Sequence, residues 1–161
     1  MNKDIKLVAL DLDRTTLNSE SHLSEVNRQA LIDAISNGVH VCIASGRAFD
    51  TLPEDIISVP GIEYAITSNG AAIYRIAGKE CLKSYLLTPS SVKTILNLTA
   101  NDTVTYEAFI KGQAFASTEY TAHPEKYGAT EHSLAYVRKT RILKDDIVSF
   151  ILEHCHELDS L

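Results

Sequence analysis

The stretch IKLVALDLDRTTL, residues 5–17, sets the architecture: an aliphatic run ends abruptly at two carboxylates, Asp11 and Asp13, followed by the hydroxyl of Thr15. The run is too short to cross a membrane and predicts a strand buried on both faces of a parallel sheet. Side chains alternate along a strand, so the two carboxylates share a face if the extended conformation continues. Burying both without a counter-ion is costly, which places them at the carboxyl end of the strand, near a cation or solvent. Open α/β sheets bind ligands at that edge.

Composition narrows the class of protein. The chain has 161 residues, of which 45% are apolar and 22% charged, as in a soluble globular protein of one domain or slightly more. A net charge of −6 without a basic cluster argues against partners such as nucleic acid or an anionic membrane. No apolar run approaches the ~20 residues of a membrane span, and the first residues lack the features of a signal peptide. Cys42, Cys81 and Cys155 form no Cys-x-x-Cys pair, which predicts reduced thiols, mostly packing residues, in a cytoplasmic protein.

The segment after the acidic pair predicts a β-α-β unit. Ser24 is a candidate N-cap for a helix that ends at Asn37-Gly38 and whose expected apolar face holds Val26, Ala30, Leu31, Ala34 and Ile35. A second apolar strand, residues 39–44, runs into Ser45-Gly46-Arg47. A right-handed crossover brings both strand ends to one edge of a parallel sheet, so we expect Ser45 to lie beside Asp11.

A third strand repeats this arrangement. A short helix over residues 53–58 precedes the strand 64–67, which ends in Ser68-Asn69-Gly70-Ala71. Three successive strands therefore end in polar or glycine-containing loops at the same edge. This repetition favours a functional site there over the alternative reading of Asp-x-Asp-x-Thr as a solvated loop that caps turns.

The pattern changes in the second half of the chain. Turns at Gly78-Lys79 and Lys111-Gly112 predict two hairpins, the second between residues 103–109 and 113–117, and Thr88-Pro89 opens a helix. Residues 120–133 predict helix and loop, residues 134–137 a strand, and residues 145–158 a closing helix with an apolar stripe of Ile147, Val148, Ile151 and Leu152. The switch from β-α-β to hairpins near residue 82 marks a second, α+β unit.

The three loops together resemble motifs of the haloacid dehalogenase-like hydrolase superfamily, and within it the Cof-type branch, subfamily IIB. Residues 11–16 match the family's Asp-x-Asp-Gly-Thr-Leu loop, residues 45–47 its Thr/Ser-Gly-Arg turn, and residues 68–71 the Ser/Thr-Asn-Gly-Ala turn of the Cof-type branch. The hairpin at Lys111-Gly112 is similar to the family's inserted cap. The resemblance implies an α/β fold: the N-terminal part of a Rossmann-like core with a parallel sheet in residues 1–82, and a partial α+β, C2-type cap in residues 83–161.

The resemblance also implies an activity. It is that of a Mg²⁺-dependent phosphatase that acts on small phosphorylated metabolites, such as sugar phosphates, through an aspartyl-phosphate intermediate. Asp11 would be the nucleophile and Asp13 the general acid and base, while Mg²⁺ would be held by the Asp11 carboxylate and the Asp13 backbone carbonyl. The implied contacts to the substrate phosphate are Thr15, Ser45, Gly46, Arg47 and Asn69.

Each of these residues has a structural alternative. Thr15 also fits a role in satisfying the loop backbone, and Ser45 a cap for the following helix. Arg47 also fits an exposed arginine beside a turn, and Asn69-Gly70 a tight turn. The run His154-Cys155-His156 looks metal-binding, but neighbouring positions on a helix point in different directions, so we do not expect a zinc site.

Two departures from the family pattern matter. Arg14 replaces the usual glycine, which puts a cation beside the site. The family's lysine and its Gly-Asp-x-x-Asn-Asp loop have no match in residues 1–161, which predicts a chain truncated within the cap, with impaired activity. The first strand would then expose an unpaired edge and favour a homo-oligomer. The alternative is a non-catalytic phosphate- or metal-binding module that acts through a partner; a phosphoryl-accepting receiver fits less well, because Ser68-Asn69 follows the third strand where a receiver has its aspartate.

Overall fold

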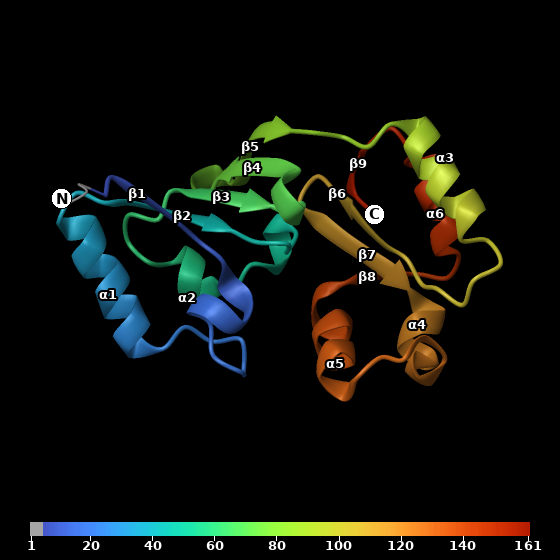
Figure 1. Cartoon of the computed structure of the whole chain (residues 1–161), viewed down its shortest axis with the longest axis horizontal. Coiled ribbons are helices and arrows are strands. Elements are labelled where there is room, and N and C mark those ends of the chain that lie inside the picture. Colours follow the sequence, from blue (N-terminus) through green and yellow to red (C-terminus); the bar gives the residue numbers. More distant parts are fainter. Residues whose placement is uncertain (1–4) are drawn as a thin grey trace. The chain divides into compact units, whose positions relative to one another are not determined.

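The chain divides into two compact units, Met1–Ser84 and Tyr85–Leu161, and the computed structural model describes residues 5–161 (Figure 1). Each unit has its own sheet and its own cluster of buried apolar side chains. The structure has the mixed α/β architecture, including parallel strands, that the sequence predicts.

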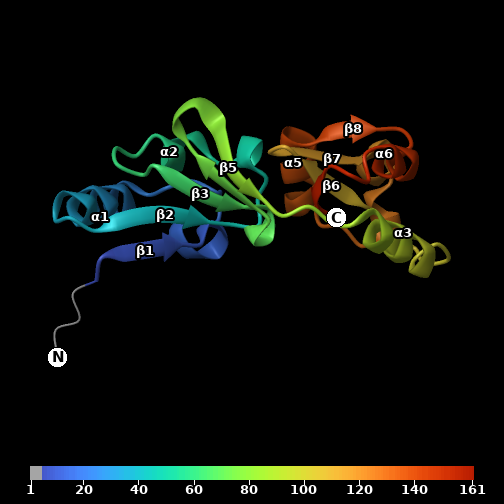
Figure 2. The same cartoon turned by 90° about the horizontal axis from the view of Figure 1, so that it is seen from above.

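The N-terminal unit is built on a five-stranded sheet of order β1-β2-β3-β4-β5 (Figure 2). The strands β1 (Leu7–Leu10), β2 (His40–Ala44) and β3 (Tyr64–Thr67) are parallel, which confirms the predicted β-α-β arrangement. The predicted hairpin is also present: β4 (Ala72–Arg75) and β5 (Glu80–Ser84) join the same sheet as antiparallel strands. The three parallel strands therefore end at one edge of a single sheet.

Helix α1 (Glu25–Ser36) crosses over between β1 and β2 and packs against β2. Its N-cap is Ser24, as predicted: the side chain accepts a hydrogen bond from the backbone N–H of Asn27. Gly38 adopts φ +84° just after the helix end, as expected for a helix that stops at Asn-Gly. Part of the predicted apolar face is wrong, because Val26 is 78% exposed while Leu31, Ile32 and Ile35 pack against the core. The short helix α2 (Glu54–Ile57) lies where the sequence predicts it.

The prediction of a first strand buried on both faces is wrong. Within the described part of the sheet, β1 is an edge strand with β2 as its neighbour, and Leu7 is 59% exposed. Exposure alternates along β1: Leu7 and Ala9 are exposed, whereas Val8 and Leu10 are half-buried, so only one face of the strand packs against the core. The buried centre of this unit is supplied instead by side chains such as Leu12, Ile43 and Ala65, each 0% exposed.

The C-terminal unit has a four-stranded sheet of order β8-β7-β6-β9. The strands β6 (Glu107–Ile110) and β7 (Gln113–Ser117) form the predicted hairpin. The sheet is completed by β8 (Ile142–Lys144), parallel to β7, and β9 (Leu158–Ser160), antiparallel to β6. Both of these strands have only three residues, too few to show the alternation of apolar and polar residues by which a strand is predicted from sequence.

Helix α3 (Pro89–Leu98) and helix α6 (Ile147–Glu153) contact each other, and α4 (Thr118–Ala122) contacts α5 (Glu131–Thr140). Val92 and Leu96 of α3, with Ile151 of α6, join the buried cluster of this unit. The caps follow the sequence: the Thr88 side chain accepts from the N–H of Ser91. The other helical elements are single turns in the loops of both units, at Leu12–Thr16, Phe49–Thr51, Ser68–Gly70, Ala77–Lys79 and Pro124–Tyr127.

Two predictions for this unit are wrong. Residues 134–137 belong to α5 and not to a strand: Leu134 and Val137 are 2% and 3% exposed, and three residues apart they share one face of a helix. The closing helix ends at Glu153, well before residue 158. Its stripe is only partly buried, because Ile147 and Ile151 are covered whereas Val148 and Leu152 are 38% and 42% exposed.

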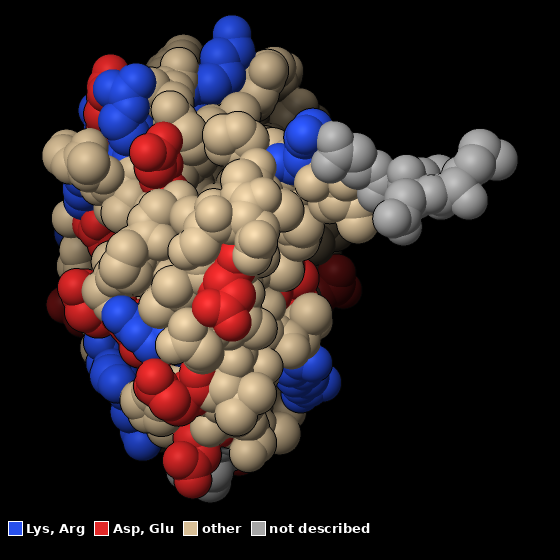
Figure 3. Space-filling model, turned by 90° about the vertical axis from the view of Figure 1, so that its left-hand side faces the viewer, with Lys and Arg blue, Asp and Glu red and all other residues tan. Residues whose placement is uncertain are grey.

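Charge is mixed on the face of the molecule shown in Figure 3, where blue Lys and Arg side chains alternate with red Asp and Glu side chains. Among the described residues, none of the helices is both long and apolar enough to span a bilayer.

We expect the three cysteines to react with iodoacetamide at different rates. All three thiols are free, and only Cys81 is exposed, which agrees with the prediction that the cysteines are mostly packing residues. Burial raises the pKa of the Cys42 thiol and leaves less thiolate at pH 8, and Cys155 is 6% exposed. Mass spectrometry should show Cys81 alkylated at least about tenfold faster than the other two. Equal rates in the folded protein would contradict this; equal rates in denaturant are the control.

Candidate functional site

The first loop of the site begins where β1 ends. Its backbone closes in one wide turn, in which the N–H of Leu17 donates to the carbonyl of Leu12 and the Thr16 hydroxyl donates to the carbonyl of Asp11 at 2.6 Å. Leu12 is fully buried and anchors the turn in the core. The Thr15 hydroxyl donates to the Asp11 carboxylate, Oγ1 to Oδ2, at 2.8 Å. The turn therefore presents two exposed carboxylates, Asp11 and Asp13, on a hydrogen-bonded frame.

Arg14 occupies a backbone position that favours glycine. Its φ of +61° and ψ of +11° lie in the left-handed region, where a side chain costs roughly 1 kcal/mol relative to glycine. The residue that departs from the family pattern thus stands where the chain geometry explains why glycine is usual. Arg14 is exposed, which leaves its charge at the surface beside the acidic loop.

The second loop, after β2, holds Ser45 and Arg47, both nearly buried at 7% and 8% exposed. The Ser45 hydroxyl accepts from the Arg47 N–H at 3.2 Å. The helical turn that follows, Phe49–Thr51, has Ala48 at its N-cap and no side-chain cap, so the alternative of Ser45 as a helix cap is wrong. The Arg47 guanidinium binds Asp13 with two bonds, Nε to Oδ2 at 2.9 Å and Nη2 to Oδ1 at 2.6 Å. Its Nη1 donates to the carbonyl of Thr51 at 3.1 Å. The alternative of an exposed Arg47 is therefore wrong.

The third loop, after β3, is strained. Ser68, Asn69 and Gly70 have φ values of +52°, +56° and +95°, three consecutive residues in the left-handed region. Such strain costs of order 1–3 kcal/mol for each non-glycine residue and is concentrated at functional sites. Ser68 is 1% exposed, and its hydroxyl has no hydrogen-bond partner among the described residues.

Direct contacts join the three loops. The carboxylate of Asp13 is bound by Arg47, and the Arg47 carbonyl accepts from the Ser68 N–H at 2.9 Å. Gly46 lies under the Asn69 carboxamide, because a Cβ built on Gly46 would be 2.7 Å from Asn69 Oδ1. The structure thus brings the acidic, hydroxyl and amide loops together at one sheet edge. The closeness of Ser45 to Asp11 stays a prediction.

The sequence reading missed two residues of this network, Thr16 and Thr51. Thr16 fixes the acidic loop through the Asp11 carbonyl, and Thr51 provides the carbonyl that holds Arg47. Thr16 stands at the last position of the acidic loop, where the family motif has leucine, so the motif assigns its hydroxyl no role. The role of Thr51 depends on its backbone carbonyl, so no residue type in the sequence signals it.

The chemistry of the first loop fits Mg²⁺. Carboxylate and carbonyl oxygens are the ligands this ion prefers, and it is usually held by one or two carboxylates with water completing the octahedron. The exposed carboxylate of Asp11 supplies such oxygens. The side chains of the run at residues 154–156 do not share one environment. Cys155 is buried, and the His154 ring packs on Phe150 with ring centroids 4.5 Å apart.

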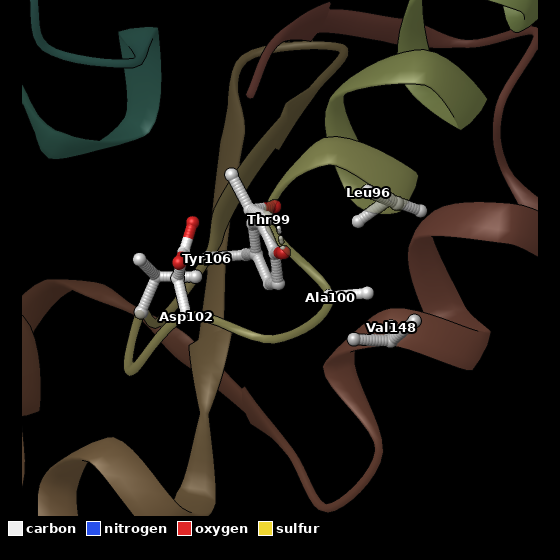
Figure 4. Close-up of a pocket in the computed structure, with 7 residues that line it drawn as sticks. Leu96, Thr99, Ala100, Asp102, Tyr106 and Val148 are labelled. Carbon is white, nitrogen blue, oxygen red and sulfur yellow. Dashed lines mark hydrogen bonds between the residues drawn. The ribbon is translucent and has the colours of Figure 1, made fainter.

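A hollow of about 280 Å³ lies within the C-terminal unit (Figure 4). It is lined by Leu96, Thr99, Ala100, Asp102, Val104, Tyr106 and Val148. The hydroxyls of Thr99 and Tyr106 are hydrogen-bonded to each other, and Asp102 is the one charged residue in this lining. The lining offers apolar contact but no acid–base pair.

The fold and the loop motifs define a class of protein. Residues 8–159 match the model of the haloacid dehalogenase-like hydrolases, so the chain belongs to that family. Among curated proteins of Bacillus subtilis, the chain is 42% identical over 71 residues to 5-amino-6-(5-phospho-D-ribitylamino)uracil phosphatase YcsE, a match that covers 44% of this chain and 28% of that protein. It is 40% identical over 77 residues to phosphatase YwpJ, with 47% and 26% covered.

Solved structures share the fold. A haloacid dehalogenase-like hydrolase from B. subtilis superimposes with a TM-score of 0.67 at 22% identity, over 91% of this chain and 56% of that one. The subclass IIB sugar phosphatase BT4131 superimposes with a TM-score of 0.69 at 15% identity, over 95% and 56%. The chain spans about half the length of these structures.

We expect the substitution Arg14→Gly to stabilise the chain by up to about 1 kcal/mol, because it removes a side chain from a left-handed position. Chemical denaturation should show a higher midpoint. Arg75→Gly is the matched control: Arg75 lies in β4, without positive φ, and pairs with Glu80, so this variant should be less stable. A midpoint for Arg14→Gly at or below that of the parent chain would contradict the account.

Proposed function

We propose that the chain carries the nucleophile half of a Mg²⁺-dependent phosphatase for small phosphorylated metabolites, such as sugar phosphates. Membership of the haloacid dehalogenase-like hydrolases supports the class of reaction. The observation that carries the proposal is the joining of three loops at one sheet edge, through the Asp13–Arg47 ion pair and the contact of Gly46 with Asn69. A phosphate dianion needs both a nucleophile and hydrogen-bond donors at one point, and these loops supply them.

In the proposed mechanism, a carboxylate oxygen of Asp11 attacks the phosphorus while the bond to the leaving oxygen breaks. Asp13 gives its proton to that oxygen, and the product is an alcohol and an aspartyl-phosphate. Water then attacks the phosphorus, Asp13 takes a proton from it, and inorganic phosphate leaves as the Asp11 carboxylate is restored.

The remaining residues hold the phosphate. The hydroxyls of Ser45 and Thr15, the Gly46 backbone and the Asn69 carboxamide are proposed to donate to its oxygens. Arg47 belongs with Asp13 and not with this group, because its guanidinium is bound to that carboxylate. When bound, Mg²⁺ neutralises phosphate charge, and its proposed ligands are the Asp11 carboxylate and the Asp13 carbonyl.

The domain assignment is part of the proposal. Residues 1–82 would be the N-terminal part of the hydrolase core, and residues 83–161 part of an α+β cap that selects the substrate. The free cysteines favour a reducing compartment such as the cytoplasm. The second candidate is a phosphate- or metal-binding module that acts through a partner.

Hydrolysis of p-nitrophenyl phosphate, with and without Mg²⁺, separates these candidates. We expect Mg²⁺-dependent turnover that falls more than about 100-fold in Asp11→Asn, since the amide is not a nucleophile. The control is Asp145→Asn, an exposed residue of the C-terminal unit that should leave activity unchanged. Activity that survives Asp11→Asn would refute the mechanism. No turnover, with Mg²⁺-dependent binding of inorganic phosphate, would favour the binding module.

We also propose that β1 pairs with β1 of a second copy of the chain. The Lys6 carbonyl accepts from His40 in β2, so the N–H and C=O groups of Leu7 and Ala9 point to the open edge. The side chain of Leu7, which is 59% exposed, would be covered by such pairing.

Light scattering on a sizing column should therefore give twice the 17.7 kDa chain mass at micromolar concentration. Leu7→Lys should shift the equilibrium at least about tenfold towards the monomer, because a charge would be buried at the new sheet junction. Val26→Lys on α1, where Val26 is 78% exposed, is the control and should remain dimeric. A parent chain that is monomeric under these conditions would refute the proposal.

A further inference from the structure

Arg47 is held at both ends. Its guanidinium makes two bonds to Asp13 and one to the carbonyl of Thr51, and its own carbonyl accepts from the N–H of Ser68. The side chain is 8% exposed, whereas Asp13 is 51% exposed. A buried, anchored cation therefore holds a carboxylate that is half open to solvent.

This geometry does not suit a phosphate ligand. Arg47 was a candidate for contact with the substrate phosphate because of its place in the Ser-Gly-Arg motif. Its planar guanidinium has five N–H groups, and three of them bind Asp13 and the Thr51 carbonyl, including the fork that suits bidentate binding of an oxyanion. Phosphate would have to displace Asp13 from that fork and leave an acidic side chain beside a dianion.

We infer that Arg47 is a positioning residue that orients Asp13 for proton transfer, and not a ligand of the phosphate. The inference rests on the proposed function, in which Asp13 gives a proton to the leaving oxygen as the phosphorus–oxygen bond breaks. A half-exposed carboxylate has several rotamers, and the fork selects one by fixing both oxygens. Proton transfer requires the acid within hydrogen-bond reach of the reacting oxygen, so a misplaced Asp13 slows the reaction.

The leaving group distinguishes the two roles. The p-nitrophenolate anion leaves without a proton, whereas an alkoxide needs one as the bond breaks. A residue that orients the acid therefore matters more for an alkyl phosphate than for p-nitrophenyl phosphate. A phosphate ligand matters equally for both esters, because both present the same phosphoryl group.

The test compares Arg47→Met and Arg47→Lys with the parent chain on p-nitrophenyl phosphate and glycerol 3-phosphate, in the presence of Mg²⁺. We expect Arg47→Met to lower kcat for the alkyl ester at least about tenfold more than for the aryl ester, with KM and inhibition by inorganic phosphate changed less than about twofold. Arg47→Lys keeps the charge but lacks the fork, so its kcat for the alkyl ester should lie between those of the parent chain and Arg47→Met. In an Asp13→Asn background, Arg47→Met should have little further effect. Arg75→Met, which removes the exposed ion pair with Glu80, is the control.

Other outcomes overturn the inference. Equal loss on both esters with at least about tenfold weaker phosphate inhibition would make Arg47 a phosphate ligand. An equal loss of kcat on both esters, with inhibition by inorganic phosphate unchanged, would show that Arg47 has only a structural role. Should Arg47→Met not fold, Arg47→Lys decides by the same ratio of kcat values. A parent chain that neither turns over these esters nor binds phosphate would refute the proposed function, and the inference with it; turnover without leaving-group dependence refutes the inference alone.

Discussion

The ion pair between Asp13 and Arg47 is the interaction on which the site depends. Arg47 comes from the loop after β2 and Asp13 from the loop after β1, 34 residues earlier, so their contact fixes two loops that the chain itself leaves far apart. Removing either partner would leave a charge beside the protein interior, at a cost of about 3–5 kcal/mol when the site is fully buried and less for a pair as exposed as this one. Through its carbonyl, Arg47 also holds the third loop at Ser68. A single residue, through its side chain and its backbone carbonyl, thus connects the three strand ends at which the site is built.

Three of the six described non-glycine residues with positive φ lie in the loops of the site. Arg14 in the acidic loop and both Ser68 and Asn69 in the third loop have positive φ, although none is glycine. Such conformations persist where the surrounding structure over-determines them. Here the frame is supplied by the buried Leu12 beneath the first loop and the buried Thr67 at the end of β3, both 0% exposed. The strained turns follow short strands with fully buried neighbours, which gives the loops little freedom to relax.

The features that depend on neighbouring residues could be predicted from the sequence. The cap at Ser24, the helix stop at Gly38 and the turn at Gly78-Lys79 depend on neighbouring residues, and the structure confirms them. The prediction that β1 is buried on both faces fails because an aliphatic run does not reveal whether one face of a strand or both are covered. The short apolar pattern of residues 134–137 fits the period of a strand as well as that of a helix, and the packing of α5 decides for the helix. The ion pair of Arg47 with Asp13 could not be predicted either. The motif identifies Arg47 as a site residue, but only the fold shows that Asp13 lies at its guanidinium.

The central claim is that three strand ends form one anion site with Asp11 as its nucleophile. A crystal structure of the chain with Mg²⁺ and beryllium fluoride tests it most directly, because the fluoride complex mimics a phosphoryl group bound to a carboxylate. The account predicts the complex on the Asp11 carboxylate, within hydrogen-bond distance of Ser45 and Asn69, while Arg47 remains bound to Asp13. The complex bound elsewhere, or loops that separate so that Ser45 and Asn69 cannot reach it, would contradict the account.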